Sequence, residues 1–336
     1  MPTRRSSRDC GVLRLSSDHS LAQDYGKGNC SRRQFLGGLA AAAVLSQGAV
    51  LRAGSPPLKL KYLLASALFG DMPVDTILPE VQRTGSLGID LWCKPHGTQR
   101  EQAQAMGMEK FNELLQRSSV RPVCFTQYPL GPFALQPEMK VLHQLGGELM
   151  VTGSRGPKNL AGAELKQAIQ KFLEELKPHA DKAAELQLTI AIENHASSLL
   201  NHPDSLRYWA ECNRHPALGI AFAPHHLHDH IDQIPQLIED LGVANLPFVY
   251  FQEHGIGSQQ KVAKEIELQQ LPGRGTLDYL PLLRALRKIE FRGWAEIFMH
   301  PTPRGVPILP TADEIAAALN QSRTHLETLV KNMNGE

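Results

Sequence analysis

The chain has 336 residues, of which 42% are hydrophobic and 21% are charged, and its formal net charge is +1. This composition is ordinary for a globular protein, and a chain of this length can bury a large core without disulfides or a structural metal. The near-zero charge argues against a nucleic-acid partner. The five cysteines show no CxxC spacing, which argues against a cysteine zinc site, and Cys93 and Cys124 are expected to be buried free thiols.

Residues 1–55 have the pattern of an export signal. Residues 31–36 read Ser-Arg-Arg-Gln-Phe-Leu and precede an Ala/Gly-rich apolar run at residues 37–50. An arginine pair directly before such a run is typical of a twin-arginine signal, and the run is shorter than the roughly 20 residues of a membrane span. We expect residues 1–55 to be disordered or cleaved, and the protein to be periplasmic or otherwise exported, with no stable membrane span after processing. The alternative is a chance arginine pair before a buried helix.

From residue 58 onward, short apolar runs alternate with longer amphipathic stretches. Strands are expected at residues 61–67, 88–92, 120–126, 148–152, 188–193, 218–223, 247–252 and 294–298. Helices are expected at residues 74–84, 99–117, 137–145, 161–186, 204–212, 231–241, 277–289 and 311–331. Eight strand–helix units in strict alternation predict one α/β domain, a (β/α)₈ TIM barrel over residues 56–336. No glycine-rich motif follows the first strand, which argues against a Rossmann fold.

Polar residues at the ends of the expected strands are the candidates for function, because TIM barrels place their sites there. Glu193 and Glu296 give the clearest signal, since each follows or lies within an apolar strand where an unpaired carboxylate is costly. Cation binding or proton transfer would account for such burial. Strands five and eight are expected on opposite sides of the barrel, so the two side chains could flank a small substrate. A lone histidine at a strand end is more often structural.

The chain from about residue 59 to the last helix resembles the xylose isomerase-like barrels, a family of sugar phosphate isomerases and epimerases. The resemblance rests on residues 190–195, 218–227, 248–255 and 293–296, and on Leu-Pro-Gly-Arg-Gly at 271–275 with Asp278. Residues 297–305, Ile-Phe-Met-His-Pro-Thr-Pro-Arg-Gly, are similar to an exported subgroup of that family.

In this family, a divalent cation is held by Glu, Asp, His and Glu at the ends of strands five to eight. The metal ligands that the resemblance implies are Glu193, His226, Gln252 and Glu296. Ala223 stands at the position of the family's Asp, so one ligand is missing, and His226, His225 or His254 could fill the gap. Such a site would suit Mn²⁺, Zn²⁺, Co²⁺ or Fe²⁺. The alternative is a site that has lost its metal.

The resemblance implies a sugar isomerase or epimerase acting on a keto- or aldo-sugar, with Glu193 and Glu296 as the catalytic pair. A carboxylate would take a proton from the carbon next to a carbonyl group of the substrate. A cation would stabilise the negative charge that develops on the carbonyl oxygen. The expected substrate contacts are Trp92, His96, His195, His254 and Arg304. The alternatives are a keto-sugar lyase or hydratase and a non-catalytic carbohydrate-binding barrel. A small-molecule carbohydrate is the expected partner, and the oligomeric state stays open, a homo-oligomer included.

Replacing Arg32 and Arg33 with lysine should leave the precursor in the cytoplasm, because the export pathway recognises the arginine pair. Cell fractionation followed by immunoblotting measures the precursor and the exported form. Normal export of the double-lysine variant would show that the twin-arginine interpretation is wrong.

Overall fold

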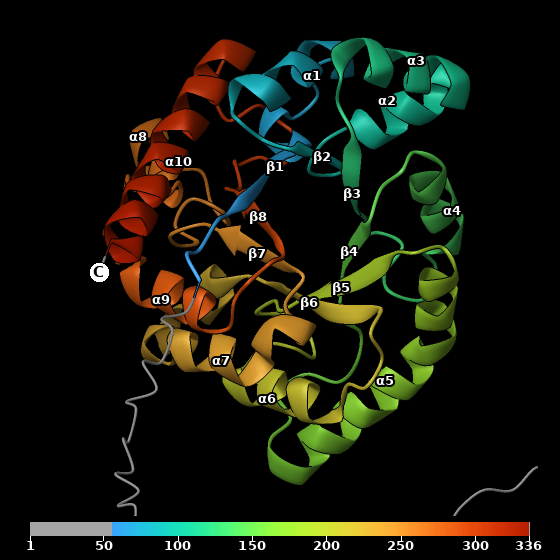
Figure 1. The fold of residues 1–336 in the computed structure, drawn as a ribbon, viewed down its shortest axis with the longest axis vertical. Helices are drawn as coiled ribbons and strands as arrows, with labels where there is room; N and C mark the ends of the chain where they lie inside the picture. Colours follow the sequence, from blue (N-terminus) through green and yellow to red (C-terminus); the bar gives the residue numbers. More distant parts are fainter. Residues whose placement is uncertain (1–55, 336) are drawn as a thin grey trace, which may run out of the picture. The chain divides into compact units, whose positions relative to one another are not determined.

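The computed structural model describes residues 56–335, so the expected export signal at residues 1–55 lies outside the described residues. Eight parallel strands pair in chain order and close into a barrel through the pairing of β8 with β1 (Figure 1). The predicted TIM barrel is confirmed. The strands are β1 Lys61–Ala65, β2 Gly88–Trp92, β3 Pro122–Thr126, β4 Leu149–Gly153, β5 Thr189–Glu193, β6 Leu218–Phe222, β7 Phe248–Phe251 and β8 Trp294–Ile297.

The helices form a ring around the barrel, as Figure 1 shows. The α-helices are α1 Val74–Arg83, α2 Gln99–Met106, α3 Met108–Ser118, α4 Gln136–Gln144, α5 Gly162–Glu185, α6 Pro203–Cys212, α7 Ile234–Asn245, α8 Lys264–Glu267, α9 Leu280–Lys288 and α10 Ala312–Asn334. The 3₁₀ helices are η1 Ser66–Phe69, η2 Pro224–Gln233 and η3 Leu268–Gln270.

The single helix expected at residues 99–117 is wrong, because the chain forms two helices there. Gly107 joins α2 to α3 with φ of +84° and ψ of 152°, a conformation that glycine adopts readily and that ends a helix. The short elements α8 and η3, in the connection after β7, were also not expected. Each strand, by contrast, lies within a residue or two of its predicted bounds, because short apolar runs between turn residues mark buried strands clearly.

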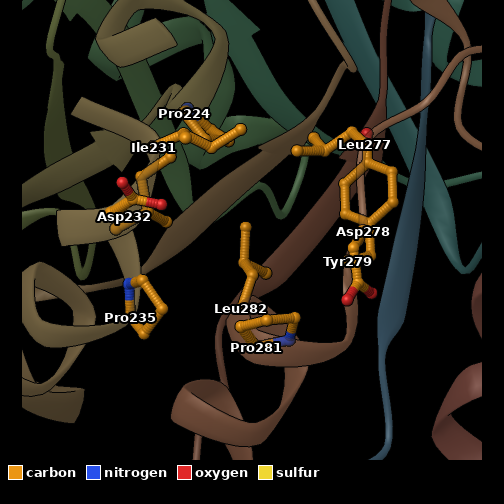
Figure 2. A pocket seen from close by; sticks show the side chains of 10 residues that line it. Pro224, Ile231, Asp232, Pro235, Leu277, Asp278, Tyr279, Pro281 and Leu282 are labelled. Atoms are coloured by element: carbon orange, nitrogen blue, oxygen red, sulfur yellow. The ribbon is translucent and has the colours of Figure 1, made fainter. Parts of the chain in front are cut away.

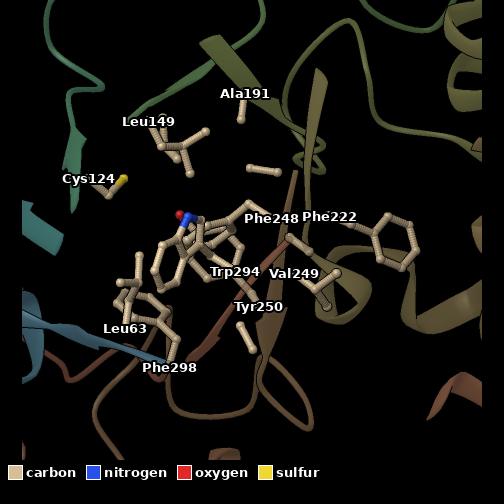
Figure 3. Packing of buried hydrophobic residues seen from close by; sticks show 14 of the residues in the cluster. Leu63, Cys124, Leu149, Ala191, Phe222, Phe248, Val249, Tyr250, Trp294 and Phe298 are labelled. Atoms are coloured by element: carbon tan, nitrogen blue, oxygen red, sulfur yellow. The ribbon is translucent and has the colours of Figure 1, made fainter. Parts of the chain in front are cut away.

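Buried hydrophobic side chains pack together in the barrel interior (Figure 3). Alternate residues of a strand point to the same face, so Trp294, Glu296 and Phe298 all project inward from β8 and the residue after it. The packed side chains around Trp294 include Leu63, Leu149 and Phe248, all buried. This packing stabilises the barrel, and functional groups are expected at the carboxyl ends of the strands.

Two smaller expectations concern cysteines and membrane spans. Cys93 and Cys124 are buried free thiols, as expected, and Cys212 is also free. Within residues 56–335, no helix combines the length and the apolar character needed to cross a bilayer.

Candidate active site

Glu193 is the last residue of β5, and its buried carboxyl is held by a tyrosine. Tyr128, in the loop after β3, donates from its hydroxyl to Glu193 Oε2 at 2.6 Å. The hydroxyl of Tyr250, on β7, lies 3.5 Å from that of Tyr128. Burial raises the pKa of Glu193 to about 8, although the hydrogen bond from Tyr128 opposes the rise. A carboxyl with this pKa can take up or release a proton near neutral pH.

Two histidines that follow β6 lie beside this carboxyl. His226 Nε2 is 3.7 Å from Glu193 Oε1, and one ligand atom from each of Glu193, His225 and His226 lies within 4.8 Å of the other two. Both ring nitrogens of His225 and Nε2 of His226 are buried without a hydrogen-bond partner, whereas buried polar atoms usually have one. Burial lowers the pKa of His225 to about 3 and also lowers that of His226. Two neutral imidazoles and a carboxyl suit a divalent transition metal.

These histidines belong to a line of five imidazole rings across the end of the barrel, called here the histidine line. Successive ring centroids are 4.0 Å apart for His195–His226, 4.1 Å for His226–His225, 6.4 Å for His225–His300 and 5.3 Å for His300–His96. The rings come from the loops after β5, β6, β8 and β2. Burial lowers the pKa of each, and the positive charge of Arg304 lowers it further.

Glu296 faces a different partner, the carboxyl of Asp90. Their strands, β8 and β2, lie on either side of β1, where Glu296 pairs with Leu63 and Asp90 pairs with Ala65. Thr126 donates to Asp90 Oδ2 at 2.6 Å, and the side chains of Asp90 and Trp92 interact with the carboxyl of Glu296. Burial raises the pKa of both carboxyls, and the charge of Asp90 raises that of Glu296 further. A proton on one of two neighbouring buried carboxyls relieves their repulsion.

An aromatic stack covers this carboxyl pair on the side of the strand ends. Trp92 and Phe298 lie two residues beyond Asp90 and Glu296, and their rings stack at 4.7 Å and 11°. Both carboxyls are fully buried. The apolar face of Trp92, expected to contact a sugar ring, therefore packs against Phe298. The charge of Glu193 also raises the pKa of Glu296, so the two glutamates lie close enough to interact.

The structure places Gln252 in a bridge between two loops. Its Nε2 donates to His254 O and to Gln270 Oε1, both at 2.9 Å. Gln270 in turn donates to His300 O at 2.9 Å and accepts from His300 N at 3.2 Å. This amide bridge joins the loop after β7 to the loop after β8. The Oε1 atom of Gln252 is buried and has no hydrogen-bond partner, so the expected role of Gln252 as a ligand stays a prediction.

His254 and Arg304 occupy separate places at this end of the barrel. His254 is partly exposed, accepts a hydrogen bond at Nδ1 from Ile256 N, and has Glu253 and His228 as its charged neighbours. It therefore lies apart from the histidine line. Arg304, in the loop after β8, acts electrostatically on all five rings of that line.

Glu253 explains part of the glycine motif at residues 271–275. It is buried and accepts hydrogen bonds from Gly273 N at 2.7 Å and Leu277 N at 3.3 Å. A Cβ atom at Gly275 would lie 2.0 Å from Glu253 Oε2. This carboxylate is therefore structural, and it requires glycine at position 275.

Tyr128 and Asp90 are absent from the sequence-based expectations. Tyr128 follows the third strand after Gln127, and a tyrosine beside an apolar strand is more often part of a core. Asp90 lies between Ile89 and Leu91, so it carries the same signal as Glu296, a carboxyl inside an apolar strand.

A cleft of about 280 Å³ is lined by residues that follow β6 and β7 (Figure 2). One wall comes from η2 and the start of α7, with Pro224 and Ile231, and the other from Leu277 and α9, with Leu282. Pro224 precedes His225, so the cleft adjoins the backbone of the histidine line. Its lining is mostly apolar.

The fold agrees with the comparisons with known proteins. The chain belongs to the xylose isomerase-like TIM barrel family, whose model matches residues 78–325. No curated protein sequence matches the chain significantly.

Solved structures share the fold at low sequence identity. An IolI protein with a bound zinc atom has a TM-score of 0.63 at 16% identity, over 81% of this chain and 99% of that chain. The 3-keto-D-glucoside 4-epimerase YcjR from E. coli has a TM-score of 0.55 at 17% identity, over 79% and 100%. A D-allulose 3-epimerase from Methylomonas sp., in complex with D-allulose, has a TM-score of 0.58 at 16% identity, over 81% and 98%.

The buried carboxyl pair should make the free energy of unfolding fall as the pH rises. Because the pKa of Glu296 is raised in the folded protein above its ordinary value of 4.5, its contribution is complete below that value and is lost as the pH rises through the folded-state pKa. Glu296→Gln should flatten this fall, by up to about 1.4 kcal/mol per pH unit for one proton. Urea unfolding at several pH values from about 5 to about 9 measures the slope.

Glu113→Gln is the matched control, because Glu113 is an exposed carboxylate on α3. It should keep the wild-type slope. If the slope were also unchanged in Glu296→Gln, Glu296 would not be the carboxyl that holds the proton.

Proposed function

We propose that this protein is a sugar isomerase or epimerase that moves a proton on the carbon next to a carbonyl group. The observation that carries the proposal is a buried carboxyl, Glu193, held by Tyr128 beside two histidines whose ring nitrogens have no protein partner. Enolisation of a keto sugar needs a base at the carbon and a positive or hydrogen-bonding group at the carbonyl oxygen. This arrangement can supply both.

Glu193, His225 and His226 would hold a divalent cation. Their donor atoms lie close enough together to converge on one ion, and the unpartnered imidazole nitrogens fit that role. His225 would compensate for Ala223, which offers no ligand at the position of the family's Asp. A bound cation would polarise the carbonyl group of the substrate and stabilise the negative charge on its oxygen.

Glu193 would take the proton from carbon, while the hydrogen bond from Tyr128 fixes the direction of its carboxyl. Return of the proton to the other face of the same carbon gives an epimer, and return to the neighbouring carbon gives an isomer. Glu296 is the proposed second acid–base group. The carboxyl of Glu296 interacts with that of Asp90. The variant Glu296→Gln tests whether Glu296 reaches the substrate or acts only through its charge.

The structural relatives support this proposal. Two of them are epimerases of sugars that carry a carbonyl group, one with D-allulose bound, and a third holds zinc. Enolisation of a carbonyl sugar on a TIM barrel with a metal site is therefore compatible with this fold.

Glu193→Gln should reduce the incorporation of solvent deuterium next to the carbonyl of a keto-hexose by about 10²–10⁴-fold, because it removes the base and keeps the size of the side chain. Mass spectrometry and NMR of a panel of keto-hexoses in D₂O measure this exchange. Tyr128→Phe is the matched variant, since it keeps the carboxyl and removes only the hydrogen bond, and its loss should be smaller.

The products separate the possible reactions. An epimer or isomer of equal mass supports the proposal, whereas loss of water or an aglycone would indicate a lyase. Exchange at the normal rate in both Glu193→Gln and Glu296→Gln would show that neither carboxyl is the base.

Protein purified without chelators should contain about one divalent transition-metal ion per chain, and His225→Ala or His226→Ala should each lower this content, because each removes a ligand. Mass spectrometry of the elements measures it. His254→Ala is the control, since His254 lies apart from the group. Unchanged content in Glu296→Gln would place Glu296 outside the metal site, and full occupancy in both histidine variants would contradict the proposed ligands.

A further inference from the structure

Arg304 is held at the end of the barrel by a firmly bonded loop. Thr302 donates from its backbone N to Glu267 Oε1 at 2.7 Å and from its hydroxyl to Gly257 O at 2.6 Å. Arg304 itself donates to Pro301 O at 3.2 Å. These bonds fix the backbone on which the guanidinium is carried, so its position is a built feature of the loop.

The guanidinium has no carboxylate partner of its own among residues 56–335. Glu267 is the carboxylate whose charge acts on it, but its two oxygens are taken by Thr302 N and by the ammonium group of Lys264. Burial lowers the pKa of Arg304 to about 10, which reflects a half-buried charge. A cation that has lost water without gaining a counter-ion is unfavourable, and a bound anion relieves that cost.

The surroundings of Arg304 offer donors rather than negative charge. Its charge acts on His96, His195, His225, His226 and His300, the whole histidine line. Imidazole rings carry no negative charge, and Glu193 is engaged by Tyr128 and lies beside His226. Lys158 also carries a positive charge that acts on His195, but it is exposed, so water and salt screen it and it is not part of the proposed subsite. An anion on a bound sugar would complete the charge balance of this region.

We propose that Arg304 binds a carboxylate group of the substrate, so that the proposed isomerase or epimerase acts on a sugar acid. This inference rests on the proposed function. A planar guanidinium matches a carboxylate with two parallel hydrogen bonds. A phosphate dianion, by contrast, is usually surrounded by several backbone N–H groups or a helix N-terminus. Here the contribution comes from one half-buried guanidinium beside neutral rings, which favours the single charge of a carboxylate.

Three ligands that differ only at C6 test the proposal. This carbon is a hydroxymethyl group in D-fructose, a carboxylate in D-fructuronate and a phosphorylated hydroxymethyl group in D-fructose 6-phosphate. Calorimetric titration of the full protein should show tightest binding of D-fructuronate. Arg304→Gln should weaken that binding by about 10- to 100-fold, the usual effect of losing hydrogen bonds to a charged group. Arg304→Lys should recover part of that binding, because lysine keeps the positive charge but lacks the two parallel N–H donors of a guanidinium.

Lys158→Gln is the control for a general effect of positive charge, and it should change the binding of D-fructuronate little, because exposed charges are screened. Thermal unfolding of each variant establishes that it is folded. Equal binding of D-fructose and D-fructuronate, no binding of D-fructuronate by the wild type, an equal loss in Lys158→Gln, or a preference for D-fructose 6-phosphate would each overturn the carboxylate assignment.

Deuterium exchange on the same three ligands separates this inference from the proposed function. Exchange without any preference for the carboxylate would overturn the role of Arg304 and leave the isomerase proposal standing. Arg304-dependent binding of D-fructuronate without exchange, on that ligand and on the keto-hexose panel, would support the subsite and contradict the proposed reaction.

Discussion

A carboxyl group inside a closed apolar barrel must share a proton, accept hydrogen bonds or bind a cation, and much of this end of the barrel follows from that constraint. Glu193 meets it with Tyr128 and two histidines. Glu296 meets it with Asp90. The same requirement applies to Arg304, whose charge is half-buried without a carboxylate of its own. Each of these groups marks a place where the fold is incomplete until a proton, a metal or a ligand is present.

The two acidic groups differ because their environments differ, and this difference supports different roles. Glu193 lies at the end of a strand, next to histidines from the following loop. Glu296 lies within a strand, beside the carboxyl of Asp90. A carboxyl beside neutral histidines and a carboxyl beside a second carboxyl differ in how readily they release a proton. Pairs of titratable groups with contrasting environments are typical of acid–base catalysis.

The sequence was sufficient to predict the barrel, since eight apolar runs between amphipathic stretches leave few other arrangements. Two of the predicted site residues, Glu193 and His226, lie beside each other in the structure, while their roles stay predictions. The sequence was less informative about contacts between residues that lie far apart in the chain. The interaction of Glu296 with Asp90 and the hydrogen bond from Tyr128 to Glu193 depend on how neighbouring strands are staggered. Local sequence patterns do not contain that stagger. Gln252 lies at a strand end as expected, and the hydrogen bond from its Nε2 to Gln270 is a contact that the sequence did not indicate.

The bridge made by Gln252 and Gln270 has a mechanical consequence. Gln270 is bonded to both backbone groups of His300 as well as to Gln252, so the loops after β7 and β8 are linked at the base of each. Any opening of this end of the barrel would have to carry both loops together as one rigid flap. His300 and Arg304 would then move together. A change in the buried turn around Gln270 could therefore alter which ligands enter, without any contact between that turn and the ligand.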